Sequence, residues 1–185
     1  MLLPITVVAL PRTGSTKLAF LLAKAYNTDV SFINSSGQIH HTHHNETNGR
    51  IIRTFRRDII EWLGSFQLME LTNLQNYHPR RNKHMFDSFL KNYRKVKYKM
   101  TDIRKKLDGY ERVWSWRQES DLCLFYEDWI DDFSILEKFT GRLVIDDDHI
   151  GKIPPIKWDI IDRDNLVEQL SRINMKAYSF HQHLT

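Results

Sequence analysis

The sequence predicts an α/β fold, a three-layer sandwich in which helices cover both faces of a mostly parallel central sheet. Two observations predict it. Short apolar, β-branched segments alternate with segments whose apolar residues recur at helical spacing, and such alternation requires crossover connections, which make a sheet parallel. In addition, a turn with glycine and hydroxyl residues, over 11–16, follows the first apolar segment. Open parallel sheets bind ligands in turns at this position.

The first two elements have the clearest patterns. Residues 5–10 are apolar and β-branched and lie between prolines, as in a strand buried on both faces. Residues 15–26 place Leu18, Leu22 and Ala25 at helical spacing, after hydroxyl residues that can cap free amides. We therefore expect a strand, a short loop and a helix in this order.

The later elements follow from the same criteria. Asp58 and Glu61 have the spacing of a capping box, which marks the start of a helix. A polar loop is expected over 34–50. The other expected elements are strands over 51–55 and 122–126, a long basic helix over about 85–106, a helix that ends near Gly141, and a final helix over about 162–175.

The composition favours one folded domain over residues 1–185. Hydrophobic residues make up 41% of the chain and charged residues 27%, which supports a buried core and excludes a disordered chain. No apolar run reaches the roughly 18–20 residues of a membrane-spanning helix, so no membrane span is expected. Cys123 is the only cysteine, which excludes a disulfide framework and a cysteine-based zinc site and favours a cytoplasmic setting.

The charge is concentrated in one stretch. The net charge of the whole chain is +4, but residues 80–106 contain eleven Lys and Arg against two Asp, a local charge of +9. Such a stretch is either a solvated helix face or a surface that attracts phosphorylated, sulfated or nucleic-acid ligands.

The loop over 11–16 has the composition of a P-loop-like, phosphate-binding turn. Gly14 allows a tight backbone turn, and the N-terminus of the following helix presents free amides and about half a positive charge to an anion. Arg12 adds a cation, and Ser15 and Thr16 add hydroxyl donors. In a Walker A loop lysine directly follows the last glycine, whereas here Lys17 comes after two hydroxyl residues. This order counts against an ordinary ATP or GTP hydrolase.

Two further patterns accompany this loop. Arg57 and Ser65 lie eight positions apart, at the end of the second long strand and along the next helix. Near the third strand, Phe-Tyr-Glu-Asp-Trp over 125–129 is followed by an apolar helical segment over 135–141 that ends in glycine.

The three motifs, in this order, resemble those of the sulfotransferases that use 3′-phosphoadenosine 5′-phosphosulfate (PAPS). The loop over 11–16 is similar to the 5′-phosphosulfate loop of that family, and Arg57 and Ser65 resemble its 3′-phosphate pair. Arg-Arg-Asp over 56–58 is especially similar to the bacterial trehalose-type branch. The resemblance covers about residues 5–141.

The resemblance implies a reaction and a set of residues. The expected enzyme transfers a sulfuryl group in line from PAPS to a hydroxyl or amine of a small-molecule or glycan acceptor and releases 3′-phosphoadenosine 5′-phosphate (PAP), without a required metal. The residues implied for nucleotide binding are Arg12, Thr13, Gly14, Ser15, Thr16, Arg57 and Ser65. Arg12 is also expected to stabilise the leaving phosphate.

The catalytic base has several candidates. His41-Thr42-His43 resembles the Lys-Thr-His strand motif of the cytosolic branch, with His43 at the catalytic position and His41 in place of the lysine. Imidazole is suited to accept a proton near neutral pH. Other branches use an early glutamate, which makes Glu46 an alternative. The two histidines could also bind zinc, copper or nickel, but without a thiolate or an obvious carboxylate partner no metal site is expected.

Some residues depart from the family pattern or have more than one interpretation. Lys17 stands where many members have tryptophan, so adenine stacking is assigned to Phe20 or Phe66. Trp114 and Trp116 either line an acceptor pocket or form the core and surface sides of one strand. Glu127, at a strand end, is expected to anchor a loop through hydrogen bonds to backbone or to an arginine.

Two other functions remain as alternatives. A nucleotide or nucleoside kinase-like enzyme would share the sheet and the phosphate loop but should have the Walker lysine. A non-catalytic polyanion-binding protein would use the basic stretch and would lose affinity steeply with salt, although nucleic acid is not the expected partner. The sequence does not indicate the oligomeric state.

Overall fold

Five parallel strands form one sheet in the computed structural model, which describes residues 4–31, 38–45, 48–72, 84, 87, 88, 91, 95–146 and 157–184. The strands are β1 (Ile5–Ala9), β2 (Val30–Ser31), β3 (Ile39–Thr42), β4 (Arg50–Phe55) and β5 (Leu122–Phe125). Their order is β2-β3-β1-β4-β5, and every pair of neighbours is parallel. The predicted α/β class and parallel sheet are therefore confirmed.

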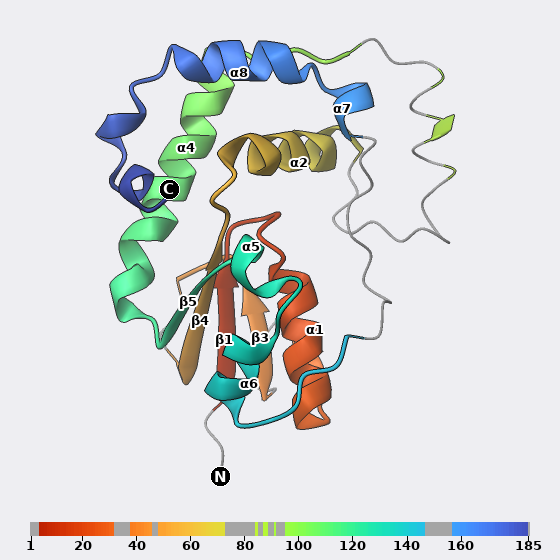
Figure 1. Cartoon of the computed structure of the whole chain (residues 1–185), viewed down its shortest axis with the longest axis vertical. Helices are drawn as coiled ribbons and strands as arrows, with labels where there is room; N and C mark the ends of the chain where they lie inside the picture. Colours follow the sequence, from red (N-terminus) through yellow and green to blue (C-terminus); the bar gives the residue numbers. More distant parts are fainter. Residues whose placement is uncertain are drawn as a thin grey trace. The chain divides into compact units, whose positions relative to one another are not determined.

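Helices connect and follow the strands (Figure 1). The α-helices are α1 (Ser15–Tyr26), α2 (Ile59–Thr72), α4 (Met100–Ser115), α5 (Tyr126–Trp129), α6 (Ser134–Thr140), α7 (Lys157–Ile160) and α8 (Arg163–Ser171). The 3-10 helices are η1 (Trp116–Glu119), η2 (Met175–Ala177) and η3 (Ser179–His183). Among the described residues, none of these helices is both long enough and apolar enough to cross a bilayer.

The chain divides into two compact units that interleave along the sequence. The first unit comprises Met1–Arg57, Tyr110–Asp146 and Gln182–Thr185, and therefore contains the sheet. The second comprises Asp58–Gly109 and Asp147–His181. Helix α4 contributes residues to both units.

In the first unit, helices cover both faces of the sheet. One face, with Ile5, Val7 and Ile52, packs against α1, α5 and α6 in a buried apolar cluster. On the other face, Phe55 of β4 lies against the last turns of α4, with ring centroids 5.8 Å from Tyr110 and 4.8 Å from Trp114. Figure 1 shows α5 and α6 in front of the strands. This arrangement is consistent with the predicted three-layer sandwich.

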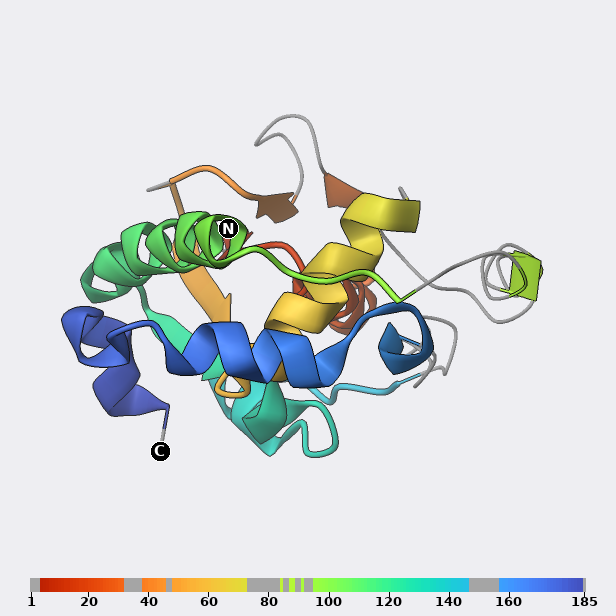
Figure 2. The ribbon, with the colours of Figure 1, turned by 90° about the horizontal axis from the view of Figure 1, so that it is seen from above.

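The second unit is helical and contains α2, α7, α8 and the beginning of α4 (Figure 2). Asp58 caps α2, since its carboxylate accepts a hydrogen bond of 2.8 Å from the Glu61 backbone N–H. The Glu61 carboxylate bonds Lys157 and the indole N–H of Trp158. Trp158 packs directly over Gly64, where an added Cβ would lie 2.5 Å from its ring. These contacts join α7 to α2.

Two predicted elements are wrong in extent. Part of the expected loop over 34–50 is the strand β3, between β2 and β1 in the sheet. In the stretch expected as one helix over about 85–106, the described residues 87, 88 and 91 are helical, but residues 95–99 are not, and α4 begins at Met100 and continues to Ser115. Before it, Val96 forms a parallel bridge with Ile161. Lysines alternate with apolar residues over 95–99, which is the period of extended chain and not of a helix.

Two smaller expectations also change. The final helix, α8, is shorter than predicted and is capped by Asp162, which accepts a 3.0 Å hydrogen bond from the Asn165 backbone. Trp114 and Trp116 do not alternate along a strand, because Trp114 lies in the last turn of α4 and Trp116 begins η1.

Candidate functional site

The loop between β1 and α1 has an unusual backbone at two positions. Arg12 has φ 69° and Gly14 has φ 77°, both in the left-handed region. For a residue with a side chain this conformation costs on the order of 1–3 kcal/mol, and away from helix ends it is enriched at binding and active sites. Two features favour glycine at position 14. One is its positive φ, and the other is the Tyr126 ring, which would lie 2.4 Å from an added Cβ.

Thr13 holds this loop in place from inside. Its side chain is fully buried, and its hydroxyl donates to the Leu10 carbonyl at 2.8 Å, because a carbonyl can only accept. The 2.6 Å contact between Thr13 Oγ1 and Thr54 Oγ1 therefore uses the proton of Thr54. Thr13 joins the loop to β4, so any contact that it makes with a ligand must come from its backbone.

Ser15 and His41 form a buried polar pair at the start of α1. His41 Nε2 lies 2.8 Å from Ser15 Oγ, and both residues are at most 5% exposed. Burial, with His43 and His40 nearby, lowers the pKa of His41 to about 4. His41 is therefore a neutral imidazole at pH 7 that fixes the position of the Ser15 hydroxyl.

His43 lies at the carboxyl end of β3 and is exposed. Its Nδ1 is 2.5 Å from the carbonyl oxygen of Ala9, the last residue of β1. Since a carbonyl oxygen only accepts, Nδ1 carries a proton, and in the neutral ring Nε2 is then the unprotonated nitrogen. The His43 ring stands edge-to-face with the His41 ring at a centroid distance of 5.0 Å. His43 thus has the tautomer that a proton acceptor needs.

Arg12 is part of the loop and supplies its positive charge. Desolvation, followed by the positive charge of Arg56, lowers the pKa of Arg12 to about 10, so it remains charged at neutral pH. Arg56 lowers this pKa because its positive charge lies near that of Arg12. Their mutual repulsion is reduced when an anion binds beside them.

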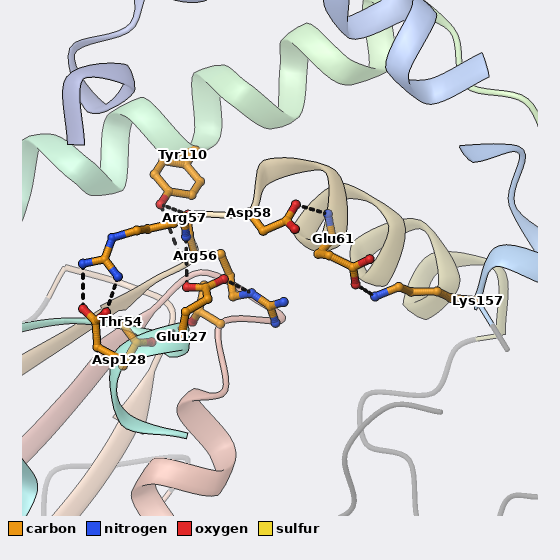
Figure 3. Close-up of polar contacts among 10 residues, drawn as sticks. Thr54, Arg56, Arg57, Asp58, Glu61, Tyr110, Glu127, Asp128 and Lys157 are labelled. Atoms are coloured by element: carbon orange, nitrogen blue, oxygen red, sulfur yellow. Dashed lines mark hydrogen bonds and ion pairs between the residues drawn. The ribbon is translucent and has the colours of Figure 1, made fainter. Parts of the chain in front are cut away.

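The chain after β4 places Arg56 and Arg57 at the same end of the sheet (Figure 3). Phe55 pairs with Phe125 in the sheet, so the residues after β4 lie next to those that begin α5. Glu127 accepts a 2.9 Å hydrogen bond from Arg56 Nε and a 3.1 Å bond from the Arg57 backbone N–H. The expectation that Glu127 anchors a loop through backbone and arginine is confirmed.

Arg57 directs both terminal nitrogens of its guanidinium at Asp128 (Figure 3). The distance from Nη2 to Asp128 Oδ2 is 2.7 Å. The guanidinium also lies over the Phe125 ring, 4.2 Å from its centroid. The hydrogen bonds to Asp128 raise the pKa of Arg57 above its already high ordinary value, so its charge is permanent.

Two aromatic residues fix the surroundings of these arginines. The Tyr110 hydroxyl donates to the Arg56 carbonyl at 2.7 Å and accepts from the Arg56 N–H at 3.2 Å. Tyr126 stacks under the Arg56 guanidinium at 4.2 Å and covers Gly14 on the loop. The loop after β1, the chain after β4 and the start of α5 are therefore in direct contact.

Other predicted residues lie elsewhere in the chain. Thr16 is half-buried in the first turn of α1, and Lys17 is buried, with its Nζ 2.5 Å from Asp146 Oδ2. Ser65 is buried on α2 in the second unit, whereas Arg57 ends the first unit. Glu46 lies outside the described residues.

The stacking candidates lie on different units. Phe20, on α1 of the first unit, is 43% exposed. Phe66 belongs to the second unit, where the Lys106 ammonium lies 4.1 Å from its ring centroid.

Three residues that support the site were not assigned this role from the sequence: Thr54, Tyr110 and Asp128. The pairing of β4 with β5 could have indicated Asp128, because it aligns 56–57 with 126–128. Thr54 and Tyr110 act through tertiary contacts for which the sequence has no local pattern.

Within the described ranges, no three His, Cys, Asp or Glu side chains form a group that could hold a metal ion. Comparison of the chain with protein-family models, with curated proteins and with solved structures finds no match. The function of the chain is therefore inferred from the geometry of the site and from the resemblance of its motifs.

Proposed function

We propose that this protein is a sulfotransferase that moves a sulfuryl group from PAPS to a hydroxyl or amine of an acceptor. The observation that carries the proposal is the loop after β1, where left-handed Arg12 and Gly14 lead into the N-terminus of α1. This geometry supports the proposed P-loop-like role, because a helix N-terminus with an adjacent half-buried cation favours a phosphate or phosphosulfate. The three motifs in the family's order support the same donor.

Each residue has a role in the proposed site. Arg12, the first amides of α1 and the Thr16 hydroxyl bind the 5′-phosphosulfate. His41 keeps the Ser15 hydroxyl in position. Arg57 binds the 3′-phosphate of the nucleotide, and PAP is the product.

The proposed reaction exchanges one sulfur–oxygen bond for another. The acceptor oxygen forms a bond to sulfur while the bond from sulfur to the 5′-phosphate oxygen breaks, and PAP leaves with the bonding electron pair. Nε2 of His43 takes the acceptor's proton, which its Nδ1 contact with Ala9 makes possible. Arg12 stabilises the charge that develops on the leaving oxygen.

The kinase-like alternative receives less support from the loop. A phosphate-binding lysine must reach the loop's ligand with its ammonium group. The nearest lysine, Lys17, is only 8% exposed and forms an ion pair with Asp146 and a cation–π contact with Phe133. These contacts tie α1 to the chain on both sides of α6, because Phe133 precedes that helix and Asp146 follows it.

The proposal is tested by PAP formation from PAPS across a panel of hydroxyl and amine acceptors. Arg12→Ala is expected to reduce turnover about 100- to 1000-fold, the effect of removing a group that stabilises the leaving oxygen. Arg112→Ala is the matched control, because Arg112 is an exposed arginine on α4 and is expected to keep wild-type turnover. An Arg12→Ala protein with full turnover contradicts the proposal.

A further inference from the structure

Asp128 holds Arg57 in the geometry with which an arginine binds a phosphate. Its two carboxylate oxygens accept hydrogen bonds from the two terminal nitrogens of the guanidinium. Guanidinium groups bind carboxylates and phosphates through the same pair of parallel hydrogen bonds. The Asp128 oxygens therefore lie where two oxygens of a phosphate group would bind.

The ion pair is one that a ligand can displace. The side chains of Arg57 and Asp128 are 34% and 41% exposed. An ion pair this accessible to water contributes only about 0–1 kcal/mol. The Asp128 carboxylate is already partly hydrated, which lowers the cost of turning it toward solvent. A phosphate dianion, with twice the charge of a carboxylate, attracts the same guanidinium more strongly.

Glu127 does not compete in this way. It bonds both the backbone N–H of Arg57 and the side chain of Arg56, so it fixes the chain that presents the guanidinium. With Arg12 also nearby, the site has three arginines and these two carboxylates. A site with surplus positive charge retains its attraction for an anion after Asp128 has moved away.

We propose that Asp128 occupies the anion-binding position of Arg57 and competes for it with a phosphate monoester. The identification of this monoester as the 3′-phosphate of the nucleotide rests on the proposed function, whereas the exchange at Arg57 does not. Asp128 then lowers the affinity for PAP and speeds its release. It is a specificity-determining residue for the site and not a catalytic one.

The first experiment measures inorganic phosphate binding, from the thermal stabilisation of the protein as phosphate is added at constant ionic strength. Asp128→Asn is expected to bind phosphate about 3- to 5-fold more tightly than wild type, because the carboxylate that competes for Arg57 is gone. Asp132→Asn removes the same charge four positions away and should leave phosphate affinity unchanged. Asparagine can keep the capping bond to Ser134 there.

A double variant shows whether Arg57 is the binding group. In Arg57→Ala/Asp128→Asn, the gain in phosphate affinity is expected to disappear. Equal phosphate affinity in wild type and Asp128→Asn overturns the inference. So does a gain that persists in the double variant, because the phosphate would then bind elsewhere.

The second experiment compares PAP with AMP, which lacks the 3′-phosphate, by calorimetric titration. Asp128→Asn should tighten PAP binding and leave AMP binding within about twofold. If phosphate shows the gain and PAP does not, the exchange at Arg57 stands and the proposed function fails. If PAP binds selectively but Asp128→Asn changes neither phosphate nor PAP affinity, the function stands and this inference fails.

Discussion

At the scale of single residues, two neighbouring histidines have opposite environments and therefore different roles. His41 is buried against Ser15, and burial lowers its pKa to about 4, which makes it a weak base at neutral pH. His43 is exposed, and the Ala9 carbonyl selects the tautomer with an unprotonated Nε2. The sequence could not separate them, because the difference arises from which residues the strand β3 lies beside.

The low pKa of His41 predicts a specific dependence of stability on pH. Between about pH 6.5, the ordinary pKa, and the folded pKa of about 4, the unfolded chain binds a proton that the folded chain does not. The free energy of unfolding therefore has its full value, as far as His41 is concerned, above pH 6.5, and it decreases as the pH falls below that value. The expected loss between pH 7 and pH 5 is about 2 kcal/mol.

Urea unfolding of wild type and His41→Gln at both pH values measures this contribution. The glutamine variant should lose about 2 kcal/mol less than wild type between pH 7 and pH 5, since other titrating groups are common to both proteins. Equal losses in the two proteins would show that His41 is not held neutral by its surroundings.

At the scale of elements, the loop after β1 depends on its contact with α5. Gly14 has a positive φ, and the Tyr126 ring occupies the space that a side chain would need. Gly141, which ends α6, also has a positive φ of 68°, but nothing lies within 4 Å of a Cβ added there. A comparison of alanine substitutions at these two positions therefore separates the cost of backbone strain from the cost of the contact with Tyr126.

Alanine at these two glycines is expected to have unequal effects on the free energy of unfolding. Gly141→Ala should cost about 1–2 kcal/mol, the backbone strain alone. Gly14→Ala should cost at least about 1 kcal/mol more, because Tyr126 must also move. Urea unfolding of the two variants gives the comparison, and equal losses would contradict the close packing of Tyr126 on the loop.

The sequence predicted the elements whose pattern is local. The helix expected over 15–26 has the bounds of α1, and the strands near 51–55 and 122–126 correspond to β4 and β5. It missed β3, because four residues with two histidines form a strand only when β1 and β2 supply its partners. The basic helix was expected to be continuous, and the extended residues 95–99 that interrupt it were missed, because lysine is common both in helices and in extended surface chain.

At the scale of the whole molecule, the described part of the basic stretch belongs to the second unit, and the loop after β1 belongs to the first. The described lysines over 91–105 are exposed, as on a solvated surface. The candidate site uses Arg12, Arg56 and Arg57, all in the first unit. A polyanion bound by the lysines would not need Arg12, whereas the proposed donor requires it.

The most direct test of the account is calorimetric titration of the protein with PAP, ATP and AMP at moderate salt, because it requires no knowledge of the acceptor. We expect selective binding of PAP. Arg57→Ala should weaken that binding by about 10- to 100-fold, the loss of a charge-assisted hydrogen-bonded pair. Absence of PAP binding, or equal affinity for ATP, would show that this site does not bind a PAPS-type nucleotide.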